Sequence, residues 1–528
     1  MRSAVLLAFA AAFVSAASAC SSSDEPPARA PDPPAVPTDD AGVDVGPAPL
    51  EWTKCDLRSE GGGPPAECTT AKVPLRAGED TGEAIDVFVK RFHPKGGKSL
   101  RQMWMLQGGP GGSAYVFEQI AEAIATKYPD VDFYLPDHRG TGKSSRIGCA
   151  AERDDSRAGF FIDAPEWSSC IEDAKTSLGE RFFAYTTTNA AHDIGVLIER
   201  ARQPGQKVFV YGVSYGTYLA NRYLQLFPTQ ADGVVLDSLV PPVSSLARQD
   251  QDGNEAAKDF FAACAKDAIC GTKLGPDPWA RAEALFASLK QGHCSEIAKP
   301  SIPTYVAFRR AFGNMLMSAE LRTLVPAVVY RAERCSPNDV VILKRFMDAV
   351  TQEPQADEMF RQWGWVLGNH IAFSELWEDP SPAVAELDAI REGAVASRDI
   401  TLEMGPLAAT WPRYAKDAYM GQWPETTTPI LVLHGGLDPA TLLRKARTGK
   451  DRYTRPGQHW IEVPTATHTV IASSTTSEKR SCGTMMMMSF FENPAAPDTS
   501  CLAKVLPLDF ASASATGAQV FGTSELWE

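Results

Sequence analysis

The sequence predicts an α/β fold: a mostly parallel sheet flanked by helices, with a mainly helical insertion. Short apolar runs, typical of strands buried on both faces, occur at residues 103–106, 208–211 and 430–433. Each run ends in a loop that contains glycine, and the second continues into an apolar-periodic stretch at 215–220. Between 241 and 423 such strands stop and amphipathic stretches follow one another. Strands that alternate with helices indicate a parallel sheet.

The second apolar run leads into a G-x-S-x-G motif, Gly212-Val213-Ser214-Tyr215-Gly216. In this motif a serine lies on a sharp strand-to-helix turn with its hydroxyl exposed above the sheet. The backbone of such a turn is strained, so the flanking positions need the smallest side chains. The pattern therefore predicts Ser214 as a nucleophile.

A glycine-rich loop follows the first apolar run, at residues 107–113 (Gln-Gly-Gly-Pro-Gly-Gly-Ser). Glycines there let the backbone approach a substrate carbonyl. A serine nucleophile needs backbone N–H donors that face the developing oxyanion. The Gly109 N–H and the N–H of Tyr215, the residue after the nucleophile, are the predicted pair.

The acid and the base are predicted from chain order. Asp438 follows the third apolar run through two glycines, and His468 follows a further strand-like run. The order Ser214, Asp438, His468 is one that such catalytic serines use. Asp237, at the end of an earlier apolar run, stays open as the alternative acid. Thr441 is expected to cap the next helix.

A resemblance to a known family rests on several linked motifs. They are the loop at 108–113, residues 137–144 (Asp-His-Arg-Gly-Thr-Gly-Lys-Ser), the motif at 212–216 and the tail at 481–501. Together these are similar to the proline iminopeptidase and tripeptidyl aminopeptidase branch of the α/β-hydrolases, over roughly residues 51–505. The resemblance implies an α/β-hydrolase fold and an activity like that of secreted bacterial exopeptidases and related cell-envelope serine hydrolases.

Two departures from the branch bear on the pocket. Gln107 stands where many relatives carry histidine, and Thr467 stands before His468 where glycine is common. Neither removes a catalytic group, but both are expected to reshape the pocket.

The amphipathic interval is expected to form a helical cap, residues 246–410, after the strand that ends near Asp237. It would divide the hydrolase core into 51–245 and 411–528, the second part including the peptidase-like tail. A cap over the nucleophile excludes water and selects substrate.

Substrate recognition is predicted to involve an acid of the cap. An aminopeptidase must pair the free ammonium of its substrate with a carboxylate, because burying that charge alone is costly. Glu375 is the candidate, since a similar Ser-Glu element occurs in the caps of relatives.

The N-terminus predicts export. Residues 1–20 combine a positive charge, an apolar stretch too short to span a bilayer and small residues that end in Cys20. This pattern is typical of a signal peptide, and Cys20 suggests a bacterial lipoprotein acylated there; plain secretion is the alternative. Residues 21–50, rich in proline, alanine and aspartate, are expected to form a disordered tether.

Ten cysteines remain besides Cys20, an even number that suits an oxidising compartment. Sequence alone does not fix their connectivity, and pairing of chain neighbours is the simplest proposal. No C-x-x-C pair is present, so no metal site is predicted. The proposed pairs are Cys55 with Cys68, Cys149 with Cys170, Cys264 with Cys270, Cys294 with Cys335, and Cys482 with Cys501.

Composition narrows the function classes further. The formal charge of −14 disfavours nucleic-acid binding. No dinucleotide fingerprint or P-loop occurs, so no cofactor is predicted. The favoured hypothesis is an exported aminopeptidase that acts on free N-termini. A carboxylesterase or lipase that acts on acyl esters and a catalytically silent envelope-binding lipoprotein are the two alternatives.

Overall fold

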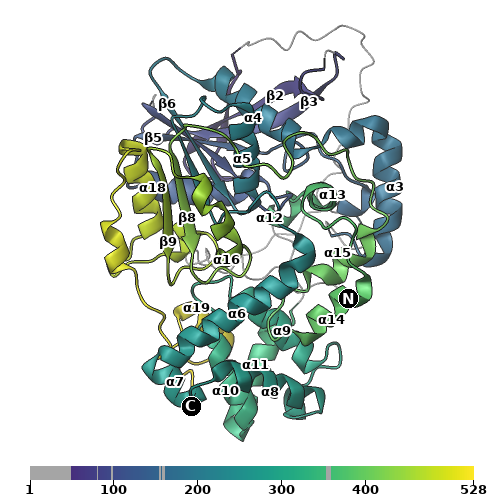
Figure 1. The fold of residues 1–528 in the computed structure, drawn as a ribbon, viewed down its shortest axis with the longest axis vertical. Coiled ribbons are helices and arrows are strands. Elements are labelled where there is room, and N and C mark those ends of the chain that lie inside the picture. Colours follow the sequence, from purple (N-terminus) through teal and green to yellow (C-terminus); the bar gives the residue numbers. More distant parts are fainter. Residues whose placement is uncertain (1–48, 80, 97–98, 154–155, 157–160, 353–357) are drawn as a thin grey trace, which may run out of the picture.

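The computed structural model describes residues 49–528 except 80, 97–98, 154–155, 157–160 and 353–357 (Figure 1). The predicted leader with Cys20 and nearly all of the predicted tether therefore lie outside the described residues. Among the residues that are described, no helix has the length and apolar character needed to cross a membrane.

The described part of the chain contains a nine-stranded sheet in the order β1-β2-β3-β5-β4-β6-β7-β8-β9. From β5 to β9 each neighbouring pair is parallel, whereas β1, β2, β3 and β5 pair antiparallel. This confirms the predicted fold class. The strands are β1 (Thr53–Asp56), β2 (Pro65–Pro74), β3 (Ala84–Phe92), β4 (Arg101–Leu106), β5 (Val131–Pro136), β6 (Lys207–Val213), β7 (Gly233–Asp237), β8 (Ile430–Gly435) and β9 (Gln458–Val463).

The central strands are apolar because helices cover both faces of the sheet. Alternate residues of β6 enter different core clusters, Val210 on one face and Tyr211 on the other. Helices α2 (Phe117–Ala125), α17 (Val470–Ser473) and α18 (Cys482–Glu492) contribute to the cluster around Tyr211. Helices α3 (Trp167–Leu178), α4 (Thr187–Ala201) and α5 (Tyr215–Leu226) contribute to the cluster around Val210.

Between β7 and β8 the described chain is helical, and most of these helices bury a separate apolar cluster. In Figure 1, α6 to α11 gather at the end of the molecule away from β2 and β3. The limits 246–410 remain a prediction for this cap. The helices are α6 (Gln249–Lys266), α7 (Ala268–Leu274), α8 (Pro278–Lys290), α9 (Thr304–Met315), α10 (Leu324–Arg334), α11 (Pro337–Val350), α12 (Glu358–Arg361), α13 (Trp365–Glu375), α14 (Val384–Gly393) and α15 (Ile400–Ala408).

The last residues of the chain pack on this helical cluster and not on the sheet. After α16 (Leu443–Ala446) and α18, the chain runs to α19 (Ala515–Phe521), whose Phe521 enters the cap cluster together with Trp527. The buried Arg331 of α10 donates through Nε to the Leu526 carbonyl oxygen at 2.8 Å. The final segment therefore adds to the apolar core of the cap.

The ten cysteines form the five neighbouring pairs expected from chain order. Disulfides of this number are typical of proteins that fold in an oxidising compartment. In the described part of the chain, the cluster of side chains that could hold a metal ion consists of Cys294, Glu296 and Cys335. The two cysteines of this cluster form one disulfide.

The Cys294–Cys335 bond is expected to contribute most through chain entropy, because it closes the longest loop, with a sequence separation of 41. Replacing both cysteines by serine should lower the free energy of unfolding by about 4 kcal/mol. The matched double variant at Cys264 and Cys270, where the separation is 6, should lose about 2 kcal/mol. Urea unfolding checks both values. An equal or reversed order would contradict the loop-entropy argument.

Candidate active site

Ser214 lies at a sharp turn between β6 and α5. Its backbone has φ 56° and ψ −128°, a conformation that non-glycine residues rarely adopt. The turn is tight enough that a Cβ added to Gly212 would lie 2.3 Å from the Gly216 carbonyl oxygen. A Cβ on Gly216 would lie 2.1 Å from the Leu106 carbonyl oxygen. The two glycines of the motif are therefore required sterically, as the sequence pattern predicted.

The glycine-rich loop after β4 lies directly against Ser214. A Cβ on Gly108 would approach the Ser214 Cβ to 2.7 Å. The side chain of Gln107 folds back, and its Oε1 accepts the Gly108 N–H at 2.9 Å. In the described part of the chain, neither Gly109 nor Tyr215 donates its backbone N–H to an acceptor. Two N–H donors near Ser214 are thus left unused.

The cap covers this loop. A Cβ on Gly109 would lie 2.9 Å from the Trp363 ring, and one on Gly111 would lie 2.6 Å from the Gly364 carbonyl oxygen. The Gly364 N–H donates to the Gly111 carbonyl oxygen at 2.9 Å. Backbone from the segment before α13 is therefore hydrogen-bonded to the loop beside Ser214.

Asp438 and His468 are in direct contact. The His468 Nδ1 lies 3.0 Å and 2.9 Å from the two carboxylate oxygens of Asp438. Asp438 Oδ1 also accepts the N–H groups of Ala440 and Thr441, each at 2.8 Å. Burial alone would raise the pKa of Asp438, but the His468 imidazole and its hydrogen bond hold that pKa below its ordinary value. Asp438 is therefore an ionised acceptor for the imidazole.

The sheet topology brings the predicted catalytic residues to one edge. Ser214 follows β6, Asp438 follows β8 and His468 follows β9, and these strands lie in the parallel order β6-β7-β8-β9. The carboxyl ends of parallel strands meet at the same edge, where α/β proteins place their sites.

The alternative acid, Asp237, has other partners. Its carboxylate accepts the Tyr211 hydroxyl at 3.0 Å and the N–H groups of Val470 at 2.7 Å and Ile471 at 3.0 Å. In the structure, His468 therefore contacts Asp438, whereas the Asp237 carboxylate faces the backbone that follows His468.

Thr441 does not cap a helix, contrary to the expectation from sequence. Its hydroxyl donates to Asp438 Oδ2 at 2.7 Å, and α16 begins after Leu442 without a side-chain cap. The spacing Asp-x-x-Thr is the signal that could have indicated this contact, because short polar side chains often bond to groups two or three residues away.

The Thr467 side chain forms a hydrogen bond between the loop that carries His468 and the cap. Its hydroxyl donates to the Leu316 carbonyl oxygen, just after α9, at 2.6 Å. A glycine at this position, which the family pattern led us to expect, would lack that bond. The departure from the family pattern therefore adds a contact between the cap and the loop that carries His468.

The Glu375 side chain is fully buried and already paired, whereas the sequence suggested a carboxylate that pairs with a substrate ammonium. Its Oε2 accepts from Arg222 Nη2 at 2.7 Å and from the Tyr218 hydroxyl at 2.8 Å. Its Oε1 accepts the Tyr414 hydroxyl at 2.7 Å. Arg222 therefore already balances the charge of this carboxylate. The contact joins α13 of the cap to α5, the helix that begins after Ser214.

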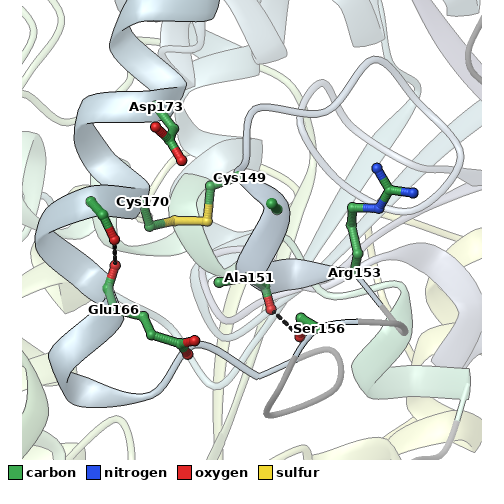
Figure 2. Close-up of a pocket in the computed structure, with 9 residues that line it drawn as sticks. Cys149, Ala151, Arg153, Ser156, Glu166, Cys170 and Asp173 are labelled. Atoms are coloured by element: carbon green, nitrogen blue, oxygen red, sulfur yellow. Dashed lines mark hydrogen bonds between the residues drawn. A yellow bond between two sulfur atoms is a disulfide. The ribbon is translucent and has the colours of Figure 1, made fainter.

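A pocket with a cavity volume of about 460 Å³ lies beside the Cys149–Cys170 disulfide, next to α3 (Figure 2). Glu166, Asp173 and Arg153 line it. Ser214, Asp438 and His468 are absent from its described lining. It is separate from the edge of the sheet that carries Ser214.

Comparison with known proteins agrees with this geometry. Residues 103–263 match the alpha/beta hydrolase fold family, and residues 398–501 match the family described as TAP-like protein. The chain therefore has the α/β-hydrolase fold, with a segment similar to the TAP-like family.

The chain has distant curated relatives. It is 28% identical over 268 residues to the serine protease Hip1 of Mycobacterium tuberculosis, over 46% of this chain and 49% of Hip1. It is 31% identical over 199 residues to the tripeptidyl aminopeptidase of Streptomyces lividans, over 34% and 36% of the two chains. The chain thus spans about half the length, or less, of the curated relatives it matches.

Among solved structures, the chain is similar to a thermophilic esterase from Thermogutta terrifontis. The identity is 14% and the TM-score 0.33, over 80% of this chain and 99% of that one.

The buried pair of Glu375 and Arg222 predicts a stability effect. Glu375→Gln should lower the free energy of unfolding by about 3–5 kcal/mol, because it leaves the Arg222 guanidinium buried without a counter-charge. Thermal and urea unfolding measure the loss. The matched control is Glu122→Gln, which breaks the more exposed ion pair of Glu122 with Arg58. Activity per folded enzyme should change alike for peptide and ester substrates. A loss confined to free-amine peptides, with unchanged stability, would instead support direct contact with the ammonium.

Proposed function

We propose that this chain is an exported serine hydrolase that acts as an aminopeptidase, releasing residues or short peptides from free N-termini. The hydrogen-bonded pair of His468 and Asp438, at the sheet edge where the strained Ser214 turn lies, carries the proposal. The TAP-like segment and the similarity to a serine protease and a tripeptidyl aminopeptidase support a peptide substrate.

In the proposed acylation step, the Ser214 Oγ attacks the scissile carbonyl carbon and His468 Nε2 takes the hydroxyl proton. Asp438 accepts from Nδ1, which fixes the tautomer that leaves Nε2 free as a base. The carbonyl oxygen becomes an oxyanion, for which the unused N–H groups of Gly109 and Tyr215 are the proposed donors. One such donor is typically worth about 3–4 kcal/mol of transition-state stabilisation.

Collapse of this intermediate breaks the peptide C–N bond. The leaving amine takes the proton from His468, and the N-terminal part of the substrate remains as an ester on Ser214. Water then attacks the ester carbonyl while His468 accepts a proton from it, and the second collapse regenerates the Ser214 hydroxyl. The overall reaction consumes one water for each peptide bond.

Glu375 has a different part in this proposal from the one that the sequence suggested. Since Arg222 already neutralises it, we assign it the task of fixing α13 of the cap onto α5. The proposed recognition of the ammonium therefore rests on the activity test and not on this residue.

The substrate class is tested with one peptide anilide in two forms, with a free and with an acetylated N-terminus. An aminopeptidase site pairs the ammonium with a negative group that acetylation would leave buried and unpaired. The free form should therefore have a kcat/KM larger by at least about 100-fold. A ratio near one, with rapid turnover of acyl esters, would reject the aminopeptidase and favour the carboxylesterase. No turnover of any of these substrates would favour the silent binding lipoprotein.

Export with a lipid anchor on Cys20 is the second part of the proposal. The leader pattern and the five disulfides support export. Metabolic labelling with a palmitate analogue should mark the full chain and not the Cys20→Ser variant. Cleavage of the leader in the wild type without any lipid on Cys20 would reject the anchor and leave a secreted enzyme.

A further inference from the structure

Asp237, the last residue of β7, and Ser238, the residue after it, contact the backbone at Ser214 and the backbone that follows His468. The Asp237 backbone carbonyl accepts the Ser214 N–H at 3.0 Å. The Asp237 carboxylate accepts the N–H groups of Val470 and Ile471, which directly follow the His468 loop. The Ser238 hydroxyl oxygen accepts the Thr469 N–H at 2.9 Å. The described backbone on the C-terminal side of His468 is thus held by side chains of two adjacent residues.

This contact holds a strained backbone. The backbone φ angles of Ser214, Ser238 and Thr469 are 56°, 61° and 65°. These values lie in the left-handed region, which residues other than glycine rarely adopt. For the β-branched Thr469 this conformation is especially unfavourable. Such strain persists only where neighbouring contacts fix it. Here the contacts are the bonds from residues 469–471 to Asp237 and Ser238.

The N-terminal side of His468 is fixed by packing. A Cβ on Gly435 would lie 2.3 Å from the Thr467 carbonyl oxygen, and one on Gly436 would lie 2.4 Å from the Pro464 carbonyl oxygen. The Leu437 N–H donates to the Ala466 carbonyl oxygen at 3.0 Å. One side is packed on the loop that carries Asp438. The other side is held by Asp237 and Ser238, together with the Ser473 hydroxyl, which donates to the Thr469 carbonyl oxygen at 3.0 Å.

We propose that Asp237 is a positioning residue that sets the separation of Ser214 and His468, with Ser238 as its assistant. Its main chain fixes the nucleophile turn, and its side chain fixes the turn after the base. This inference rests on the proposed function only in that His468 acts as the base for Ser214.

The charge of Asp237 makes this positioning dependent on pH. Burial raises the pKa of Asp237 to about 6, against the lowering effects of the Ile471 and Val470 N–H groups, the Tyr211 hydroxyl and the nearby His468. Above pH 6 the carboxylate is ionised and both oxygens accept. As the pH falls through about 6, one oxygen gains a proton and loses accepting capacity. Asparagine has the same shape as this protonated acid.

The test compares Asp237→Asn with wild type at pH 8, on whichever substrate, peptide or ester, the wild type turns over. The variant should keep its KM and lose about 10- to 100-fold in kcat, with the enzyme concentration taken from the amount of serine that a fluorophosphonate labels. This is the range expected when a catalytic group is misplaced by a fraction of an ångström to one ångström. Ser238→Ala should lose less, in the same direction. On the acid side of the pH profile, the wild-type kcat should fall with a steeper slope than a single ionising group produces. The Asp237→Asn profile should fit a single ionising group.

Tyr211→Phe is the matched control, because it removes one side-chain donor to the same carboxylate and keeps the bonds to Val470 and Ile471. It should retain kcat at pH 8 within about three-fold and move the acid limb to higher pH, since the lost bond favours the charged form. A folded Asp237→Asn with unchanged kcat and pH profile would overturn the proposal. So would equal losses in Tyr211→Phe, which would indicate a general effect on stability. If the wild type turns over no substrate, the rate of fluorophosphonate labelling at Ser214 replaces kcat.

Discussion

The strained turn at Ser214 is the constraint on which the rest of the site depends. The turn exists because three backbone segments approach more closely than any side chain would allow, at Gly108, Gly212 and Gly216. This packing places the start of α5 against the end of β4, so that the N–H groups of Gly109 and Tyr215 lie near the nucleophile with no acceptor in the described chain. Strain of this kind costs on the order of 1–3 kcal/mol and persists only in a rigid setting.

The helical cap contributes rigidity as well as cover. The buried pair of Glu375 and Arg222 joins α13 to α5, and the Thr467 hydroxyl joins the base loop to the end of α9. A buried ion pair adds little net stability, because desolvation offsets the attraction, but breaking it is costly. Breaking the pair would therefore leave a charge buried in the contact between the cap and α5.

Local patterns in the sequence predicted the strands and the motif around Ser214, but they did not predict contacts between residues that are far apart in the chain. The apolar runs that became β4, β6 and β8 and the motif around Ser214 are short-range signals, and parallel topology then brings Asp438 and His468 together. The environment of Glu375 was missed because its partner, Arg222, lies 153 residues away. No local periodicity encodes such a pairing. The same holds for Asp237, whose partners at 470–471 are brought to it only by the sheet.

The central claim is that Ser214 is the nucleophile of a serine hydrolase. Reaction of the folded protein with a fluorophosphonate, followed by intact mass and peptide mapping, tests it most directly, because the reagent modifies serines activated by a neighbouring base. If Ser214 is the nucleophile, one adduct per chain will form, on the peptide that contains residues 212–216, and none will form in Ser214→Ala. An adduct on another serine, or no adduct on folded wild-type protein, would contradict it.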